Sequence, residues 1–292
     1  MQLFLQMVMG GLTVGAVYAL LGMGYSLIYR ASGLLTFAQG EYFMLGAFVG
    51  LTFFVNMGLP FPLVLILTTA VMVAIGFLSE KVIITPLISR GSKPIHIVLA
   101  TIGLAIFLQN LAMLVWGSRA FTMPTIFDDM PVFIGSVFII PQNIAIVIAM
   151  LVLMGGLHLF MNKSRAGLML RAAAQDRMAA SIVGINVPLA IGLTWGISVG
   201  LAGLAGLLIA PVHGVHAHMG LLVGLKGFAA AVIGGYGSIY GAVIGGILVG
   251  LVETFTSGYI SSNFKDVVVF AFLLLVLFLK PEGLIRSEQI DK

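Results

Sequence analysis

Long apolar segments alternate with short polar ones along almost the whole chain. A helix that crosses a bilayer needs about 20 apolar residues, and fewer where it is short or re-entrant. Nine segments approach this length: 5–28, 38–56, 62–80, 96–116, 142–160, 189–210, 221–236, 238–255 and 266–280. The seventh and eighth are short and rich in glycine, so they form either two thin spans or one re-entrant pair. The pattern predicts an all-α polytopic membrane protein with about 8–9 transmembrane or re-entrant helices, in a single transmembrane domain over residues 1–292.

The composition excludes a soluble globular protein. Of the residues, 60% are hydrophobic and only 8% are charged, whereas a soluble domain carries about 25% charged residues. The 37 glycines agree with helices that approach closely in a membrane. Cysteine is absent, which excludes disulfides, thiolate metal sites and cysteine nucleophiles. Lys and Arg do not occur before Arg30, so the N-terminal segment is expected to be the first span rather than a cleaved signal peptide.

The distribution of Lys and Arg predicts the orientation, because cytoplasmic loops of membrane proteins are enriched in both. If residues 161–188 are cytoplasmic, the inside holds Arg30, Lys81, Arg90, Lys93, Lys163, Arg165, Arg171, Arg177, Lys280, Arg286 and Lys292. The outside then holds only Arg119, Lys226 and Lys265. This bias places the C-terminus in the cytoplasm and the N-terminus outside. The net charge of +4 therefore reflects topology rather than nucleic-acid binding.

The longest cytoplasmic loop, residues 161–188, contains the basic sequence RAAAQDRMAASIVGIN. Apolar residues recur in it at every fourth position: Leu170, Ala174, Met178 and Ile182. This spacing predicts one short amphipathic helix that stops near Gly184. Such a loop either determines topology and lies on the lipid surface, or docks onto another protein. Its two ends join consecutive spans, so a force on the loop would reach both.

The loop sequence SRAGLMLRAAAQDRMAASIVGINV resembles the coupling loop of permease subunits of ABC importers for branched-chain amino acids, the LivH type. The resemblance continues over nearly the whole chain in the order found in that family. It is carried by GLLTFAQGE at 33–41, ATIGLAIFLQN at 100–110, GSRAFTMPTIF at 117–127, GLKGFAAAVIGGYGSIYGAVIGGILVG at 224–250 and KPEGL at 280–284.

The resemblance implies the ABC importer permease fold in a bacterial inner membrane. It implies that residues 161–188 insert into a groove on a separate ATPase subunit. The ATPase-coupling candidates are Arg165, Arg171, Gln175, Asp176, Arg177, Ala180, Gly184 and Asn186. The implied partners are two ABC ATPase subunits, a second homologous permease subunit and an external or periplasmic substrate-binding protein. The sequence contains no G-x-x-x-x-G-K-[ST] phosphate loop, so ATP and Mg are expected on the partner ATPase and no cofactor in this chain.

Polar side chains at membrane depth are costly, so each is a candidate for the translocation pathway. Thr36, Gln39 and Glu41 separate two apolar segments and are flanked by glycines, which fits a broken helix lining a pathway. The alternative is an ordinary cytoplasmic turn with Glu41 at a helix N-terminus; the resemblance favours the pathway hairpin. Gln109 and Asn110 lie deep in a span and point about 100° apart. The two side chains cannot both face one pore. The alternative to pore lining is that they form hydrogen bonds between helices.

The glycine-rich block 234–246 supplies further pathway candidates: Gly234, Gly235, Gly237, Ser238 and Gly241. Glycines near the midplane would let helices hinge as a gate. Gly241 and Gly245 are also spaced for close helix crossing, and tight packing is compatible with a gate. Residues 36–48 and this block are candidate counterparts in an inverted repeat.

External loops are expected at 117–141 and 211–220. The first carries Asp128 and Asp129 and is a plausible landing surface for a binding protein. The second contains the three histidines of HGVHAH: His213, His216 and His218. Because no carboxylate or cysteine supports them, they are expected to be interfacial residues rather than zinc ligands. Glu253, near the end of a span, is expected to reach the interface.

The sequence contains no catalytic constellation such as HExxH, so the chain is expected to be a transporter subunit rather than an enzyme. The resemblance implies a permease that moves leucine, isoleucine and valine inward. The same type of importer for urea, short amides or other amino acids is an alternative. An ion-coupled secondary transporter or channel is a more distant one, with Glu41 and Glu253 as its deep carboxylates.

Overall fold

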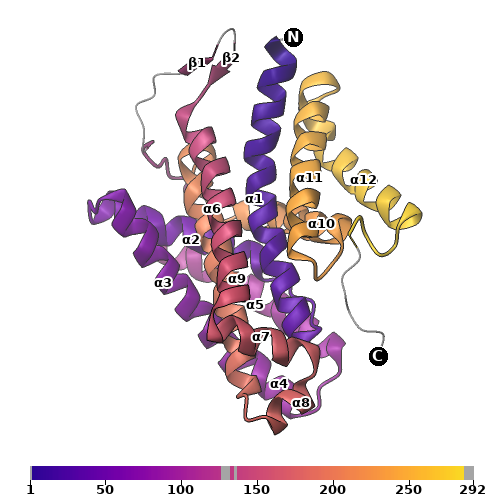
Figure 1. Cartoon of the computed structure of the whole chain (residues 1–292). Helices are drawn as coiled ribbons and strands as arrows, with labels where there is room; N and C mark the ends of the chain where they lie inside the picture. The colour runs from indigo at the N-terminus through magenta and orange to yellow at the C-terminus, as the bar shows by residue number, and fades with distance from the viewer. Residues whose placement is uncertain (1, 126–131, 135–136, 286–292) are drawn as a thin grey trace.

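The computed structural model describes residues 2–125, 132–134 and 137–285. In these residues the chain forms a helical bundle with one small hairpin at its end (Figure 1). The first half contains α1 (Gln2–Ser32), α2 (Gln39–Leu51), the π-helical turn η1 (Thr52–Asn56), α3 (Phe61–Ser79), the π-helical turn η2 (Glu80–Ile84), α4 (Thr85–Ser89), α5 (Pro94–Trp116) and the strands β1 (Val132–Ile134) and β2 (Val137–Ile139). The second half contains α6 (Pro141–Lys163), α7 (Arg165–Gln175), α8 (Arg177–Ile182), α9 (Val187–His213), α10 (Met219–Gly234), α11 (Ile239–Tyr259), the 3-10 turn η3 (Ser262–Phe264) and α12 (Lys265–Leu279).

Seven helical segments of the described residues are long and apolar enough to cross a membrane. They lie in α1, α3–α4, α5, α6, α9, α11 and α12. Two further apolar helices, the 13-residue α2 and the 16-residue α10, are shorter. All nine coincide with the predicted apolar segments, and the all-α polytopic fold is confirmed. The seventh and eighth segments are separate helices, α10 and α11, of which only α11 has the length of a span.

The bundle has two distinct ends (Figure 1). The N-terminus and the β1–β2 hairpin lie at one end, named here the hairpin end. The helices α4, α7 and α8 lie at the other end, named here the α8 end. The segments 117–141 and 161–188, which were predicted to face opposite sides of the membrane, therefore begin from opposite ends of the bundle. Lys226 departs from that prediction, because it is buried within α10 instead of lying in an outer loop.

Glycines allow the central helices to touch through their backbones. A Cβ placed on Gly46 of α2 would overlap Gly203 of α9, and a Cβ on Gly250 of α11 would overlap Gly15 of α1. Apolar burial does not drive helices together in lipid, so close van der Waals approach at small residues takes its place. Many of the 37 glycines in the sequence therefore lie where α1, α2, α9, α10 and α11 meet.

The packing follows the pattern of an inverted repeat. Helices α1 and α9 are long and run in opposite directions (Figure 1), and each is followed by a short link and a short helix, α2 or α10. Helix α1 packs on α11, and α9 packs on α3 in the same way. Gly40 of α2 and Gly220 of α10 lie against each other where these helices begin. The counterpart of residues 36–48 is therefore the segment from the α9–α10 link through α10, and the predicted pairing with residues 234–246 is wrong.

We expect Gly206→Ala to destabilise the bundle, because a Cβ on this residue of α9 would overlap the carbonyl oxygen of Phe43. The expected loss is about 1–3 kcal/mol, typical of overpacking. Gly156→Ala is the matched control, since a Cβ on this residue of α6 meets open space and alanine favours a helix by up to about 1 kcal/mol. Thermal unfolding of the two purified variants in one detergent measures the difference. Equal midpoints would show that the α2–α9 contact is looser than described.

Candidate functional site

The chain breaks its helix between α1 and α2, where a polar link was predicted. Gly33, with φ of +65°, ends α1. Thr36 is buried, and its Oγ1 accepts a hydrogen bond from the Ala38 backbone N–H at 3.3 Å. Gln39 opens α2 and donates from Nε2 to both the carbonyl oxygen and Oγ of Ser198, each at 3.0 Å. Because Ser198 lies in the middle of α9, this link folds into the bundle interior and is not an ordinary surface turn.

Glu41 lies in the first turn of α2 and is also buried. Its Oε2 has no hydrogen-bond partner among the described residues. A Cβ placed on Gly220 would lie 2.8 Å from that oxygen, so Glu41 sits where the N-termini of α2 and α10 converge. The partial positive charges of helix N-termini favour a carboxylate at this point.

Gln109 and Asn110 of α5 separate as their 100° offset predicts. Gln109 is half-buried and reaches the α9–α10 link, with Nε2 lying 3.4 Å from the Ala217 carbonyl oxygen and 3.0 Å from His218 Nδ1. Asn110 is exposed and donates to the Ile106 carbonyl of its own helix at 2.7 Å. Gln109 therefore ties α5 to the link, whereas Asn110 makes no contact of that kind in the described residues.

Residues 234–246 form the turn between α10 and α11, followed by the first turns of α11. Gly235 and Gly237 adopt φ of +110° and +94°, which favours glycine. The Ser238 Oγ accepts from the Gly241 N–H at 3.0 Å and caps α11. A Cβ on Gly241 would overlap the Gly234 carbonyl, so tight packing is the observed use of these glycines.

The turn between α10 and α11 lies beside the end of α1. The ring of Tyr236 packs on that of Tyr29 with 4.6 Å between centroids, and Tyr29 lies in the last turn of α1, at the α8 end. The observed packing agrees with the tight-packing interpretation of these glycines, and a gating role for them stays a prediction.

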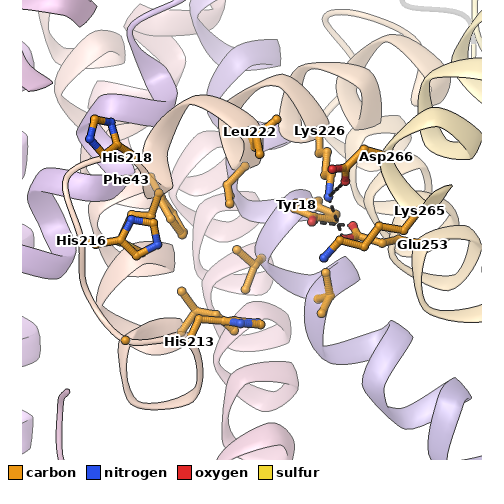
Figure 2. Close-up of a pocket in the computed structure, with 16 residues that line it drawn as sticks. Tyr18, Phe43, His213, His216, His218, Leu222, Lys226, Glu253, Lys265 and Asp266 are labelled. Carbon is orange, nitrogen blue, oxygen red and sulfur yellow. Dashed lines mark hydrogen bonds and ion pairs between the residues drawn. The ribbon is translucent and has the colours of Figure 1, made fainter. Parts of the chain in front are cut away.

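A buried ionic cluster joins α1, α10, α11 and α12 (Figure 2). Lys226 Nζ lies 2.7 Å from Glu253 Oε1 and 2.6 Å from Asp266 Oδ1. The Tyr18 hydroxyl donates to Glu253 Oε2 at 2.6 Å. Lys265 Nζ approaches Glu253 Oε1 more loosely, at 3.6 Å. Glu253 is therefore held inside the bundle and does not reach the interface as predicted.

Sequence reasoning did not identify this cluster, although one observation pointed to it. A Lys and a Glu in apolar helices are costly unless they are paired, and Lys226 interrupts an apolar run. The partner could not be chosen from the sequence, because Lys226 and Glu253 are 27 residues apart across a turn. Only the antiparallel packing of α10 on α11 brings them together.

The cluster borders a cavity of about 270 Å3 on the hairpin side of the bundle. Its walls come from α1, α2, α9, α10, α11, α12 and the α9–α10 link. His213, His216 and His218 lie across the cavity from the ionic cluster (Figure 2). In the described residues these histidines do not gather into a metal site with one another or with carboxylates. Asp128 and Asp129 lie outside the described residues.

The two predicted external loops meet at the hairpin end. The backbones of Phe121 and Val215 form an antiparallel bridge with two N–H···O bonds of 2.8 Å. This bridge joins the 117–141 segment to the α9–α10 link. Part of the 117–141 segment is ordered as the β1–β2 hairpin rather than as a plain loop.

At the α8 end, the predicted single amphipathic helix is two helices, α7 and α8. Asp176 adopts an extended backbone (φ −150°, ψ 112°), and its Oδ1 accepts from the N–H groups of Met178 and Ala179 at 2.8 and 3.0 Å. Aspartate is among the strongest N-cap residues, so it ends one helix and starts the next. The predicted stripe is consequently divided: Leu170 is buried, whereas Met178 and Ile182 are 75% and 79% exposed.

The remaining candidates of this helix pair fall into two groups. Arg165 and Gln175 are exposed, and the Arg171 Nη1 lies 3.3 Å from Asn162 Oδ1. Other residues attach the pair to the bundle. Arg177 donates to the Ala31 carbonyl at the end of α1 at 3.2 Å, and Ala180 is buried.

The helix pair ends at two residues that the sequence had singled out. Gly184, with φ of +84°, lies just beyond the end of α8. Asn186 caps α9, its Oδ1 accepting from the Leu189 N–H at 3.1 Å. The α7–α8 pair is therefore joined directly to the first turn of α9.

A multi-pass bundle with helices broken in its interior and buried polar groups beside the breaks has the architecture of a membrane transport protein. The family model described as "Branched-chain amino acid transport system / permease component" matches residues 7–277. The chain belongs to this family of branched-chain amino acid transport permeases.

Similar proteins cover the chain almost end to end. It is 37% identical over 302 residues to the high-affinity branched-chain amino acid transport system permease protein BraD of Pseudomonas aeruginosa, covering 99% of this chain and 98% of that one. It is 37% identical over 303 residues to the corresponding permease protein LivH of Escherichia coli K12, covering 99% and 97%. Among solved structures, PsaBC from Streptococcus pneumoniae in complex with Fab matches with a TM-score of 0.46 and 15% identity, over 97% of this chain and 93% of that chain.

We expect Lys226→Met to destabilise the chain strongly, because it leaves Glu253 buried without its closest cation. Breaking one partner of a buried ion pair costs about 3–5 kcal/mol. Lys265→Met is the matched control on the same carboxylate: its side chain is 39% exposed and lies 3.6 Å away, so the loss should stay below about 1 kcal/mol. Thermal unfolding of both variants in detergent measures the two losses of stability. A larger loss in the Lys265 variant than in the Lys226 variant would contradict the prediction.

Proposed function

We propose that this chain is one permease subunit of an ATP-driven ABC importer in a bacterial inner membrane. The importer moves leucine, isoleucine and valine inward from an external binding protein. The observation that carries the proposal is the near-full-length similarity to permeases whose names state branched-chain amino acid transport. ATP and Mg bind a separate ATPase, since this sequence contains no phosphate-binding loop.

The α8 end faces the cytoplasm in this proposal. Arg30 closes α1 there, and Lys163 closes α6 just before the α7–α8 pair. Such basic clustering favours the cytoplasmic side. The hairpin end then faces outward, and the bridge between Phe121 and Val215 makes the two outer segments a single surface on which a binding protein can land.

The α7–α8 pair is the element through which the ATPase moves the permease. Met178, Ile182 and Val183 of this pair are 75%, 79% and 74% exposed at the α8 end. Exposed apolar side chains gathered on one short element mark a protein contact. Through Arg177 and Asn186, a displacement of this surface reaches the end of α1 and the start of α9.

The first test is a pull-down of the tagged chain in mild detergent, with mass spectrometry of the bound proteins. We expect an ABC ATPase and a second permease to be retained. Ile182→Asp should weaken ATPase retention by about 2 kcal/mol or more of association free energy, as for a central interface residue. Leu3→Asp is the matched control, because Leu3 is an exposed apolar residue at the opposite end. Retention of the ATPase by the Ile182 variant at the wild-type level would contradict the docking surface.

Asp176 gives a second test, of coupling rather than docking. Asp176→Ala removes the cap between α7 and α8, at a cost of about 1 kcal/mol, and should lower the leucine transported per ATP hydrolysed in proteoliposomes. Asp176→Asn is the conservative control, since asparagine caps equally well and should keep the ratio. A normal ratio in the alanine variant would remove the helix break from the coupling mechanism.

Transport assays distinguish two other functions from the proposed importer of branched-chain amino acids. An importer of urea or short amides would take up these solutes in preference to leucine with the same ATPase. An ion-coupled carrier is the alternative that the buried Glu41 would favour. It would transport without ATP and in response to an imposed ion or proton gradient, whereas the proposed importer requires ATP and ignores the gradient.

A further inference from the structure

The cavity on the hairpin side has one charged side and otherwise mainly apolar walls. Figure 2 shows the ionic cluster on one side and the three histidines on the other. The apolar lining is supplied by Val14, Val17, Phe43, Ile209, Leu222 and Val223. Small-molecule sites commonly combine apolar walls with a few converging polar groups, and this cavity has that composition.

The four charged residues beside the cavity are not equally available. Lys226 and Glu253 form the inner pair, with side chains only 5% and 9% exposed. Lys265 and Asp266, at the start of α12, have side chains 39% and 35% exposed. Lys265 is also the loosest member, at 3.6 Å from its carboxylate. Asp266 Oδ1 also lies 2.6 Å from Lys226 Nζ, so Asp266 is joined to the inner pair while its partly exposed carboxylate lines the cavity beside Lys265. The outer pair thus offers one cation and one anion to a ligand while the inner pair keeps the helices joined.

The charge balance of the cluster restricts what it can bind. Two lysines face two carboxylates, so the cluster is neutral as a whole when all four are ionised. A simple anion or cation would leave a net charge in a largely buried place, which is costly. A zwitterion adds no net charge, because its carboxylate can turn to Lys265 and its ammonium group to Asp266.

The size and walls of the cavity restrict the rest of the ligand. Its volume of about 270 Å3 lies just below the range of about 300–1,000 Å3 that holds drug-sized molecules. A single amino acid fits this space better than a peptide. The apolar part of the lining favours an apolar side chain.

We propose that this cavity is a subsite for a zwitterionic amino acid with an apolar side chain. The permease would then contact the cargo itself, with Lys265 and Asp266 holding its main-chain charges and Leu222 its side chain. The inference rests on the proposed function for the cargo class. It goes beyond that function in placing a selective site within this one chain, beside the middle of α1 and the C-terminal end of α9.

The test is equilibrium binding of radiolabelled L-leucine to the assembled importer in nanodiscs, without binding protein or nucleotide. Lys265→Gln and Asp266→Asn should each weaken binding about tenfold, the loss expected for one charge-assisted hydrogen bond. Lys280→Gln is the matched control, because Lys280 is exposed beyond the other end of α12 and lines no part of the cavity. Isocaproate, which lacks the ammonium group, and isopentylamine, which lacks the carboxylate, should compete poorly, whereas L-valine should compete well.

Side-chain selectivity gives an independent readout. Leu222→Ala should weaken binding of leucine more than binding of alanine, because only leucine contacts the lost wall. Leu221→Ala is the matched control. Leu221 precedes Leu222 on α10 and is also apolar and exposed, but it does not line the cavity. A purely structural role for Leu222 would lower both affinities together.

The outcomes separate this inference from the proposed function. If the wild-type importer takes up leucine with ATP and binding protein, yet the Lys265 and Asp266 variants bind leucine normally, the subsite is wrong and the function stands. Equal competition by isocaproate would also overturn the subsite. If the wild-type importer fails to take up leucine at all, the proposed function itself is wrong. Gel filtration and retained subunits establish that each variant is assembled, so that a loss of binding counts as support.

Discussion

Backbone contact at glycines is the constraint on which the rest of this molecule depends. Inside a bilayer water does not drive apolar surfaces together, so helices associate through close van der Waals approach. Gly46 against Gly203 and Gly15 against Gly250 bring α2 to α9 and α1 to α11. Gly40 and Gly220 do the same for the two short helices. Because these contacts hold the two inverted halves at backbone distance, Gln39 at the α1–α2 break and Lys226 in α10 have fixed partners.

The polar groups of the interior are satisfied in two different ways. At the α1–α2 break, Gln39 donates to the carbonyl and the hydroxyl of Ser198, and the Ser198 hydroxyl donates to the Gly24 carbonyl of α1. At the cavity, charge is balanced by charge, with Lys226 between Glu253 and Asp266. Both arrangements follow the rule that polar groups in lipid find partners within the protein, although Gln39 Oε1 and Glu41 Oε2 have no hydrogen-bond partner among the described residues. Only the second leaves partly exposed ions facing a space large enough for a ligand.

Helices α1 and α9 connect the α7–α8 pair with the cavity. Helix α1 lines the cavity with Val17 and Tyr18 and ends at Ala31, whose carbonyl accepts a hydrogen bond from Arg177. Helix α9 begins at the Asn186 cap beside α8 and reaches the cavity near its other end. A displacement of the α7–α8 pair would therefore shift two cavity walls that run in opposite directions (Figure 1). In the importer that we propose, this geometry gives ATPase movement a direct path to the cargo.

The sequence alone determined the helical segments, their approximate bounds and the family, because apolar length and local motifs are properties of continuous stretches. It also singled out Gly184 and Asn186 near the end of the 161–188 loop, since helix stops and caps are local features. The tertiary structure decided that Asp176 divides the helix of this loop, that the turn in residues 234–246 packs beside the end of α1, and that Lys226 pairs with Glu253. The position of the turn and the ion pair depend on how helices distant in the sequence pack together. The division of the helix depends on the backbone conformation of Asp176 alone. Periodicity along a single segment contains neither kind of information.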